Sequence, residues 1–141
     1  MTPDQTMLVQ ASFDHIARDA DAFARLFYER LFDRDPTLRR LFRHDPQAQR
    51  TRLIQALSGA VRGLDDLDAM RPGLAALGSR HADYGVVAAD YATVGRALVD
   101  ALRITLGARF TAPVEQAWKA VFVALGGAML AGVQRTRVLA A

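Results

Sequence analysis

Histidine is the residue type in this chain with the clearest capacity for metal chemistry. The sequence has three histidines, His15, His44 and His81, and no cysteine. Disulfides, thiolate zinc sites, iron–sulfur clusters and cysteine nucleophiles are therefore excluded. His-x-x-x-His zinc spacing, a glycine-rich phosphate loop after a strand and paired carboxylates on one buried face are missing as well. A bound metal must use a histidine, a carboxylate or a prosthetic group.

Two of the histidines have polar surroundings. His15 follows an aspartate at the boundary of the first expected helix, where a solvated surface residue is the simpler interpretation. His44 lies in a loop between Arg43 and Asp45, where a surface or salt-bridged histidine is favoured over a ligand. A contact with an acidic group of a cofactor is the alternative for His44.

His81 has apolar surroundings. It shares one helical stripe with Leu74, Leu77 and Gly78, so its ring is expected to face the same apolar space as those residues. Taken alone, this pattern favours a core histidine bonded to the backbone over a metal ligand.

The length and composition indicate one folded domain, residues 1–141. Hydrophobic residues make up 51% of the chain and charged residues 23%, which is typical of a globular protein rather than a disordered one. The net charge is +3, but the arginines are scattered, so nucleic-acid binding is not expected.

The sequence contains no segment that we expect to target or span a membrane. The N-terminus has no basic stretch followed by an apolar core, so a secretory signal is not expected and a cytoplasmic location is the default. The longest apolar run, residues 120–133, is shorter than the roughly 20 residues of a membrane span and contains three glycines. We expect it to be a buried helix.

Helical periodicity accounts for most of the chain, and no segment alternates convincingly as a strand. The first expected helix has an acidic first turn at Asp4 and an apolar face of Val9, Ser12, Phe13, Ile16 and Ala20. The second carries Phe23, Phe27 and Leu31 and must stop near Asp35, because Pro36 disfavours a helical conformation in the residue before it. Pro36 suits the first turn of a short helix through Leu41.

The rest of the chain predicts four further helices. Gly63 to Arg71 reads as a linker, and Pro72 is expected to open the helix of His81, which Gly85 ends. The expected bounds of the others are about 46–62, 89–106 and 112–137. The prediction is an all-α domain of six to eight helices.

Several ordered segments resemble one known family. They are residues 26–32, Pro36, 41–42 and 49–53 in the first half, and 77–86, 90–95 and Trp118 in the second. Together these segments cover nearly the whole chain and resemble the single-domain haem globins of bacteria and the globin domain of flavohaemoglobins. The resemblance implies the globin fold, a three-on-three helical sandwich that encloses haem b.

The resemblance implies a role for each of several residues. His81 is the expected proximal ligand of the haem iron, with its other ring nitrogen donating to a backbone carbonyl, that of Leu77. Tyr28 and Gln49 are the expected distal residues that donate hydrogen bonds to the bound gas, and Leu53 lies one turn beyond Gln49. An interfacial tyrosine with its hydroxyl in water is the alternative for Tyr28. A one-residue shift near Pro46 would instead bring another side chain inward, and Arg50 or Arg52 would then be candidates.

Further residues are implied around the haem. Phe42 matches the aromatic residue that lies against the haem plane. The alternative, an ordinary core residue, describes nearly the same apolar position. Arg52, Arg80 and His44 are candidates to pair with the haem propionates, although arginines on helices are usually solvated.

The sequence also departs from the family. In flavohaemoglobin-like globins a tyrosine and a glutamate support the proximal histidine, and Tyr91 matches the tyrosine. The expected place of the glutamate, around Gly132 and Val133, holds apolar residues. A truncated proximal network makes peroxidase-like chemistry less expected, and flavin and nicotinamide domains are not present in this chain.

Three functions are compatible with these features. In the first and favoured one, haem reversibly binds O₂, and NO or CO, for storage, delivery or scavenging. In the second, the chain is a nitric oxide dioxygenase that depends on a separate reductase. In the third, it is a gas-sensory or haem-free interaction domain, against which the retained His81, Tyr28 and Phe42 argue. Either a monomer or a homodimer is expected.

Overall fold

A computed structural model describes residues 1–140, with side chains described as far as Gln134. The described residues form six α-helices and three short 3₁₀ helices and contain no strand, which confirms the all-α prediction. In chain order the elements are α1 (Pro3–Ala17), α2 (Ala20–Arg34), η1 (Pro36–Leu41), α3 (Pro46–Arg62), η2 (Gly63–Asp66), α4 (Leu67–Asp83), α5 (Ala88–Leu106), η3 (Gly107–Arg109) and α6 (Ala112–Ala140).

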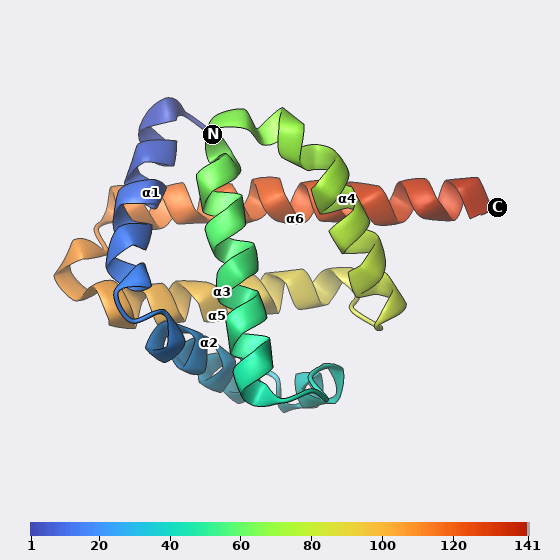
Figure 1. Cartoon of the computed structure of the whole chain (residues 1–141), viewed down its shortest axis with the longest axis horizontal. Helices are drawn as coiled ribbons and strands as arrows, with labels where there is room; N and C mark the ends of the chain where they lie inside the picture. The colour runs from blue at the N-terminus through green and yellow to red at the C-terminus, as the bar shows by residue number, and fades with distance from the viewer. Residues whose placement is uncertain (141) are drawn as a thin grey trace.

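The helices form two layers of three. Helices α1, α3 and α4 cross in front of α2, α5 and α6 in Figure 1, and α5 and α6 run side by side in opposite directions. Helix α3 ends at η2 and α4 begins there, and the two helices diverge from this point. Helix α3 packs against α2, whereas α4 packs against α6 (Figure 1). The arrangement is the expected three-on-three sandwich.

The prediction that Ala20 belongs to the first helix is wrong. Ala20 belongs to α2 rather than to the first helix, since α1 ends at Ala17. The reason is a cap: the Asp19 carboxylate accepts a hydrogen bond from the Ala22 backbone N–H and so begins a new helix. The predicted stop at Asp35 and the short helix through Leu41 are confirmed.

The predicted linker from Gly63 to Arg71 is also wrong. Helix α4 begins at Leu67, where the Asp66 carboxylate accepts a hydrogen bond from the Ala69 N–H. Pro72 therefore lies inside this helix instead of opening it. Its ring has no N–H to donate to the carbonyl of Asp68 four residues earlier, and Asp68 is exposed. Gly85 follows the helix with a φ of 99°, as its predicted role as terminator requires.

The core joins the first and last helices through one buried polar contact. Trp118 of α6 is fully buried, and its Nε1 donates a hydrogen bond to the Ser12 hydroxyl of α1 at 2.9 Å. The predicted inward face of α1 is confirmed, since Val9, Phe13 and Ile16 are buried around it.

Helices α4 and α6 cross at two glycines. A Cβ atom on Gly78 would overlap the backbone of Met129, and a Cβ atom on Gly132 would overlap the backbone of Ala75. Each glycine thus allows one helix backbone to lie directly against the other. This crossing fixes the position of α4, on which His81 lies one turn after Gly78.

Helix α6 is apolar but only partly buried. Among the described residues it is the one helix long and apolar enough to cross a membrane, over Ala112–Gln134, with a mean hydropathy of 1.4. The core helices of soluble domains can have the same length and composition. Trp118 is buried as expected. The run 120–133 is helical, but only Val121 and Gly132 in it are buried and Val123 is 76% exposed, so the expected burial of this run is wrong for most of its residues.

Candidate functional site

His81 has one ring nitrogen committed to the backbone of its own helix. Its Nδ1 donates a hydrogen bond to the Leu77 carbonyl at 2.8 Å, which confirms the predicted partner. The proton on Nδ1 leaves Nε2 as an unprotonated lone pair, the form that binds a metal. Within the described part of the chain Nε2 has no hydrogen-bond partner. His81 is half-buried beside half-buried Leu74 and Leu77, an apolar setting for this lone pair.

In the described part of the chain, His81 belongs to no cluster of metal-binding side chains. The described residues contain no group of three or more histidine, aspartate and glutamate side chains that could hold a bare metal ion. One imidazole cannot hold such an ion alone, so the donor set suits a metal whose remaining ligands come from a prosthetic group.

Tyr91 lacks the carboxylate partner that the family pattern would give it. Its hydroxyl is buried and, among the described residues, has no hydrogen-bond partner. Burial raises the pKa of this phenol. A glutamate at Gly132, one of the two places considered, is also excluded sterically by the contact of α6 with Ala75. Tyr91 therefore has no carboxylate partner in the described chain, and its place in a proximal network stays a prediction.

Tyr28 lies in an aromatic cluster formed by the second half of α2 and by Phe42, which follows η1. Its ring centroid is 5.0 Å from that of Phe27, 6.1 Å from that of Phe32 and 5.3 Å from that of Phe42. Burial raises the pKa of the Tyr28 hydroxyl to about 12, with the Arg50 guanidinium opposing the shift. This burial argues against the alternative of an interfacial tyrosine with its hydroxyl in water.

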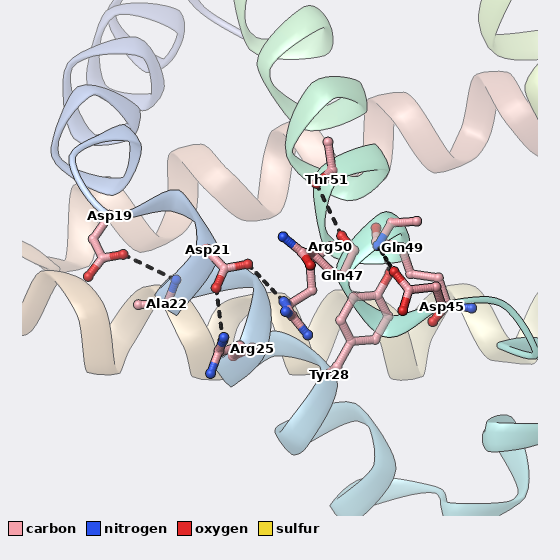
Figure 2. Close-up of polar contacts among 11 residues, drawn as sticks. Asp19, Asp21, Ala22, Arg25, Tyr28, Asp45, Gln47, Gln49, Arg50 and Thr51 are labelled. Carbon is pink, nitrogen blue, oxygen red and sulfur yellow. Dashed lines mark hydrogen bonds and ion pairs between the residues drawn. The ribbon is translucent and has the colours of Figure 1, made fainter.

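The structure brings Tyr28 and Gln49 together. The Tyr28 hydroxyl donates a long hydrogen bond, 3.5 Å, to the backbone carbonyl of Gln49 in the first turn of α3. A bond of this length is weak, so the proton can be turned to a better acceptor. Asp45 caps this turn through the Ala48 N–H and thereby fixes where Gln49 lies (Figure 2).

An ion-pair network between α2 and α3 lies beside Tyr28. The Asp21 carboxylate of α2 accepts hydrogen bonds from Arg25 and from Arg50 of α3, both at 2.8 Å (Figure 2). These two arginines lower the pKa of Asp21, Arg50 having the larger effect. The network ties the start of α3 to α2 and so helps to hold Gln49 near Tyr28.

A cavity of about 280 Å³ lies between these groups. Its walls combine the aromatic and distal residues with three arginines and a proline. They are Arg25, Tyr28, Phe32, Arg39, Phe42, Pro46, Gln49 and Arg50.

The other predicted site residues lie at the edges of this region. Leu53 is half-buried against the core, one turn after Gln49. Arg52, Arg80 and His44 are exposed, and within the described residues none of them has an ion-pair partner. Their assignment to the propionates stays a prediction.

The comparisons with known proteins decide the family. The pattern of the globin family matches residues 25–129. The chain is a globin. This globin is 27% identical to neuroglobin-1 of Oncorhynchus mykiss over 94% of its own length and 92% of that protein. It is 30% identical to a flavohemoprotein of Bordetella parapertussis over its full length, which spans 36% of that relative.

Solved structures agree with this assignment. The globin superposes with a TM-score of 0.86 and 30% identity on an engineered carbene transferase based on a Rhodothermus marinus protein assigned as a nitric oxide dioxygenase. That match covers 100% of this chain and 99% of the other. A hexacoordinated haem protein from a tardigrade, with a TM-score of 0.80 and 18% identity, shares the fold.

The residues present fit haem. The unpartnered Nε2 of His81 suits an axial iron ligand, and the surrounding leucines suit a porphyrin face. Membership of the globin family makes the chain a haem protein, with diatomic gases as its class of ligand.

Sequence reasoning missed three residues of the site. Arg25, Arg39 and Asp21 received no role, although the spacing of Asp21 and Arg25 on one helix predicts an ion pair. Nothing in the sequence indicated that Asp21 also meets Arg50, because those residues lie 29 positions apart.

Proposed function

We propose that this globin holds haem b through His81 and reversibly binds O₂, and NO or CO, for storage, delivery or scavenging. The observation that carries the proposal is the hydrogen bond from His81 Nδ1 to the Leu77 carbonyl, which orients the ring and leaves Nε2 for iron. The Leu74 and Leu77 side chains would lie against the proximal haem face, and Phe42 would lie against the haem plane. Arg52 and Arg80 would pair with the propionates.

Tyr28 and Gln49 would stabilise the bound gas. Haem held by His81 would supply partial negative charge to a dioxygen ligand, and a hydrogen-bond donor such as Tyr28 would stabilise that charge by about 1–3 kcal/mol in a dry pocket. The Tyr28 hydroxyl carries its proton at neutral pH, as an unshifted tyrosine also does, and it would give up its weak bond to the Gln49 carbonyl to donate to the gas.

A nitric oxide dioxygenase is the second candidate. The support is the likeness, over nearly both whole chains, to the engineered protein based on an assigned nitric oxide dioxygenase. Haem iron would supply the binding place for dioxygen and the one electron with which dioxygen and NO become nitrate. The chain's own residues would orient dioxygen through Tyr28 and keep water from it with Phe42 and Leu53. Repeated turnover would then require a separate reductase.

For either function we propose that the protein is cytoplasmic and is a monomer or a homodimer.

Absorption spectra test the proposal. The purified chain with haem should show a Soret band that shifts on reduction and shifts again with O₂ or CO. His81→Ala should lose stable haem binding, whereas His15→Ala, a matched change in α1, should keep it. Spectra without any gas-dependent shift, or equal haem retention in both variants, would contradict the proposal.

Nitrate production separates the two candidates. The oxygenated protein is mixed with NO in the presence of a reductase, and nitrate is measured over time. Nitrate that accumulates over many equivalents indicates a dioxygenase. A single stoichiometric burst indicates a carrier that scavenges NO once per loading.

A further inference from the structure

The cavity beside Tyr28 carries more positive charge than binding a neutral gas requires. Three arginines line it, Arg25, Arg39 and Arg50, and no carboxylate of the described chain is among its lining residues. O₂, NO and CO are uncharged, so guanidinium groups hardly attract or orient them. The charge therefore indicates an anionic occupant.

The nearest carboxylate leaves most of this charge available. Asp21 accepts one hydrogen bond from the Nε of Arg25 and one from the Nε of Arg50. The terminal nitrogens of both guanidinium groups have no partner among the described residues. One carboxylate cancels one of three positive charges, and Asp21 is itself 52% exposed.

Arg50 is the most enclosed of the three arginines. Its side chain is 16% exposed, and it reaches from α3 toward α2 beside the Tyr28 ring (Figure 2). A largely buried guanidinium with unused donors is costly unless an anion or water satisfies them. Arg39 adds a charge from η1: its guanidinium lies 4.6 Å from the centre of the Phe32 ring and has no carboxylate partner in the described chain.

We propose that this arginine cavity, lined by Arg25, Arg39 and Arg50 beside Tyr28, binds nitrate. The planar donor fork of a guanidinium matches the edge of a planar oxyanion, and the aromatic walls suit its weakly hydrated faces. A volume of about 280 Å³ admits such an ion together with water. The choice of nitrate rests on the proposed reaction of dioxygen with NO, because nitrate is the product of that reaction. The cavity shares Tyr28 and Gln49 with the proposed gas site, so nitrate formed there would have a binding place beside it.

Calorimetric titration with sodium nitrate tests the site. The haem-loaded chain is used in its reduced form with CO, so that the iron is occupied, and sodium gluconate keeps the ionic strength constant. Wild type should bind one nitrate, and Arg50→Gln should bind it about tenfold more weakly. Arg62→Gln, a matched exposed change on the same helix, should bind nitrate like wild type.

Two further variants keep the test decisive if Arg50→Gln folds poorly. Arg39→Gln breaks no ion pair and should weaken nitrate binding about threefold. Asp21→Asn removes the competing carboxylate and should strengthen it about threefold, a change that a purely structural role of the network would not produce.

The outcomes separate this site from the proposed enzymatic function. No nitrate binding to wild type, or equal binding by wild type, Arg39→Gln and Asp21→Asn, would overturn the site. Binding that depends on Arg50 and Arg39 supports it, even where steady nitrate production with a reductase is absent and the dioxygenase candidate fails.

Discussion

At the residue scale, Tyr28 links burial to chemistry. Its phenol is packed against three aromatic rings, and this burial raises its pKa to about 12. The same aromatic packing that excludes water would strengthen a hydrogen bond from its hydroxyl to a partly charged ligand.

Tyr28→Phe tests this donor. We expect O₂ to dissociate about tenfold faster or more, because the variant loses a hydrogen bond worth about 1–3 kcal/mol, while CO dissociation changes little since bound CO carries little charge. Stopped-flow ligand replacement measures both rates. Tyr84→Phe, at a position 73% exposed, is the control, and equal O₂ rates in wild type and Tyr28→Phe would exclude the role.

The raised pKa of Tyr28 also predicts an alkaline effect on stability. The unfolded chain loses this proton near the ordinary pKa of 10.0 and the folded chain only at about 12, so the unfolded state binds fewer protons between these values. The free energy of unfolding should therefore fall as pH rises through this interval. Denaturant unfolding should show a smaller fall in Tyr28→Phe, and identical pH dependence in both proteins would contradict the assigned shift.

At the element scale, the crossing of α4 and α6 positions His81. Gly78 and Gly132 each lie against the backbone of the opposite helix, so there is no side chain whose movement could relieve a larger residue. The separation of the two helices, and with it the position of His81 relative to the distal side, depends on these two positions having no side chain.

Gly78→Ala should destabilise the fold strongly. The added methyl group overlaps the Met129 backbone, so α4 must move, at a cost of about 2–3 kcal/mol, and haem retention should fall with it. Gly73→Ala on the same helix has nothing within 4 Å and should raise stability by about 0.5–1 kcal/mol. Denaturant unfolding compares the two, and equal stabilities would refute the tight crossing.

At the scale of the whole molecule, an ion pair joins α2 to α5 behind the site. The Asp100 carboxylate, 10% exposed, accepts hydrogen bonds from Arg34 at 2.6 and 2.9 Å and from Arg30 at 3.4 Å. Arg34, more than Arg30, holds the pKa of Asp100 below its ordinary value. The network fastens the helix that carries Tyr28 to the helix that carries Tyr91.

Asp100→Asn should lower stability by about 1–2 kcal/mol at neutral pH. Because the folded pKa is depressed, this contribution is present above the ordinary carboxyl pKa of 3.8 and is lost as pH falls through the folded value. Wild type and variant should therefore converge in acid. Asp33→Asn, which changes an exposed carboxylate on α2, serves as control, and a difference that persists in acid would contradict the pKa shift.

The sequence by itself determined most of the helices and the partner of His81 within its own helix, whereas the role of His81 as iron ligand stays a prediction. Prolines at 36 and 46 and aspartates before helices act on their immediate neighbours, so helix starts were largely readable, although the caps Asp19 and Asp66 were overlooked. The leucine stripe of His81 and the ordered family segments predicted its role and its bond to Leu77. The bond was predictable because His81 and Leu77 lie within two turns of one helix. The pairing of Tyr28 with Gln49 came from the resemblance alone.

Only the tertiary structure decided which distant side chains meet. The convergence of Arg25, Arg39 and Arg50 on one cavity depends on how α2, η1 and α3 pack, and no periodicity within a single helix records it. The glycine crossing of α4 with α6 likewise depends on the distance between two helices rather than on either helix alone. Helical periodicity fixes which face a residue occupies, whereas the residues opposite that face are set by the packing of the whole core.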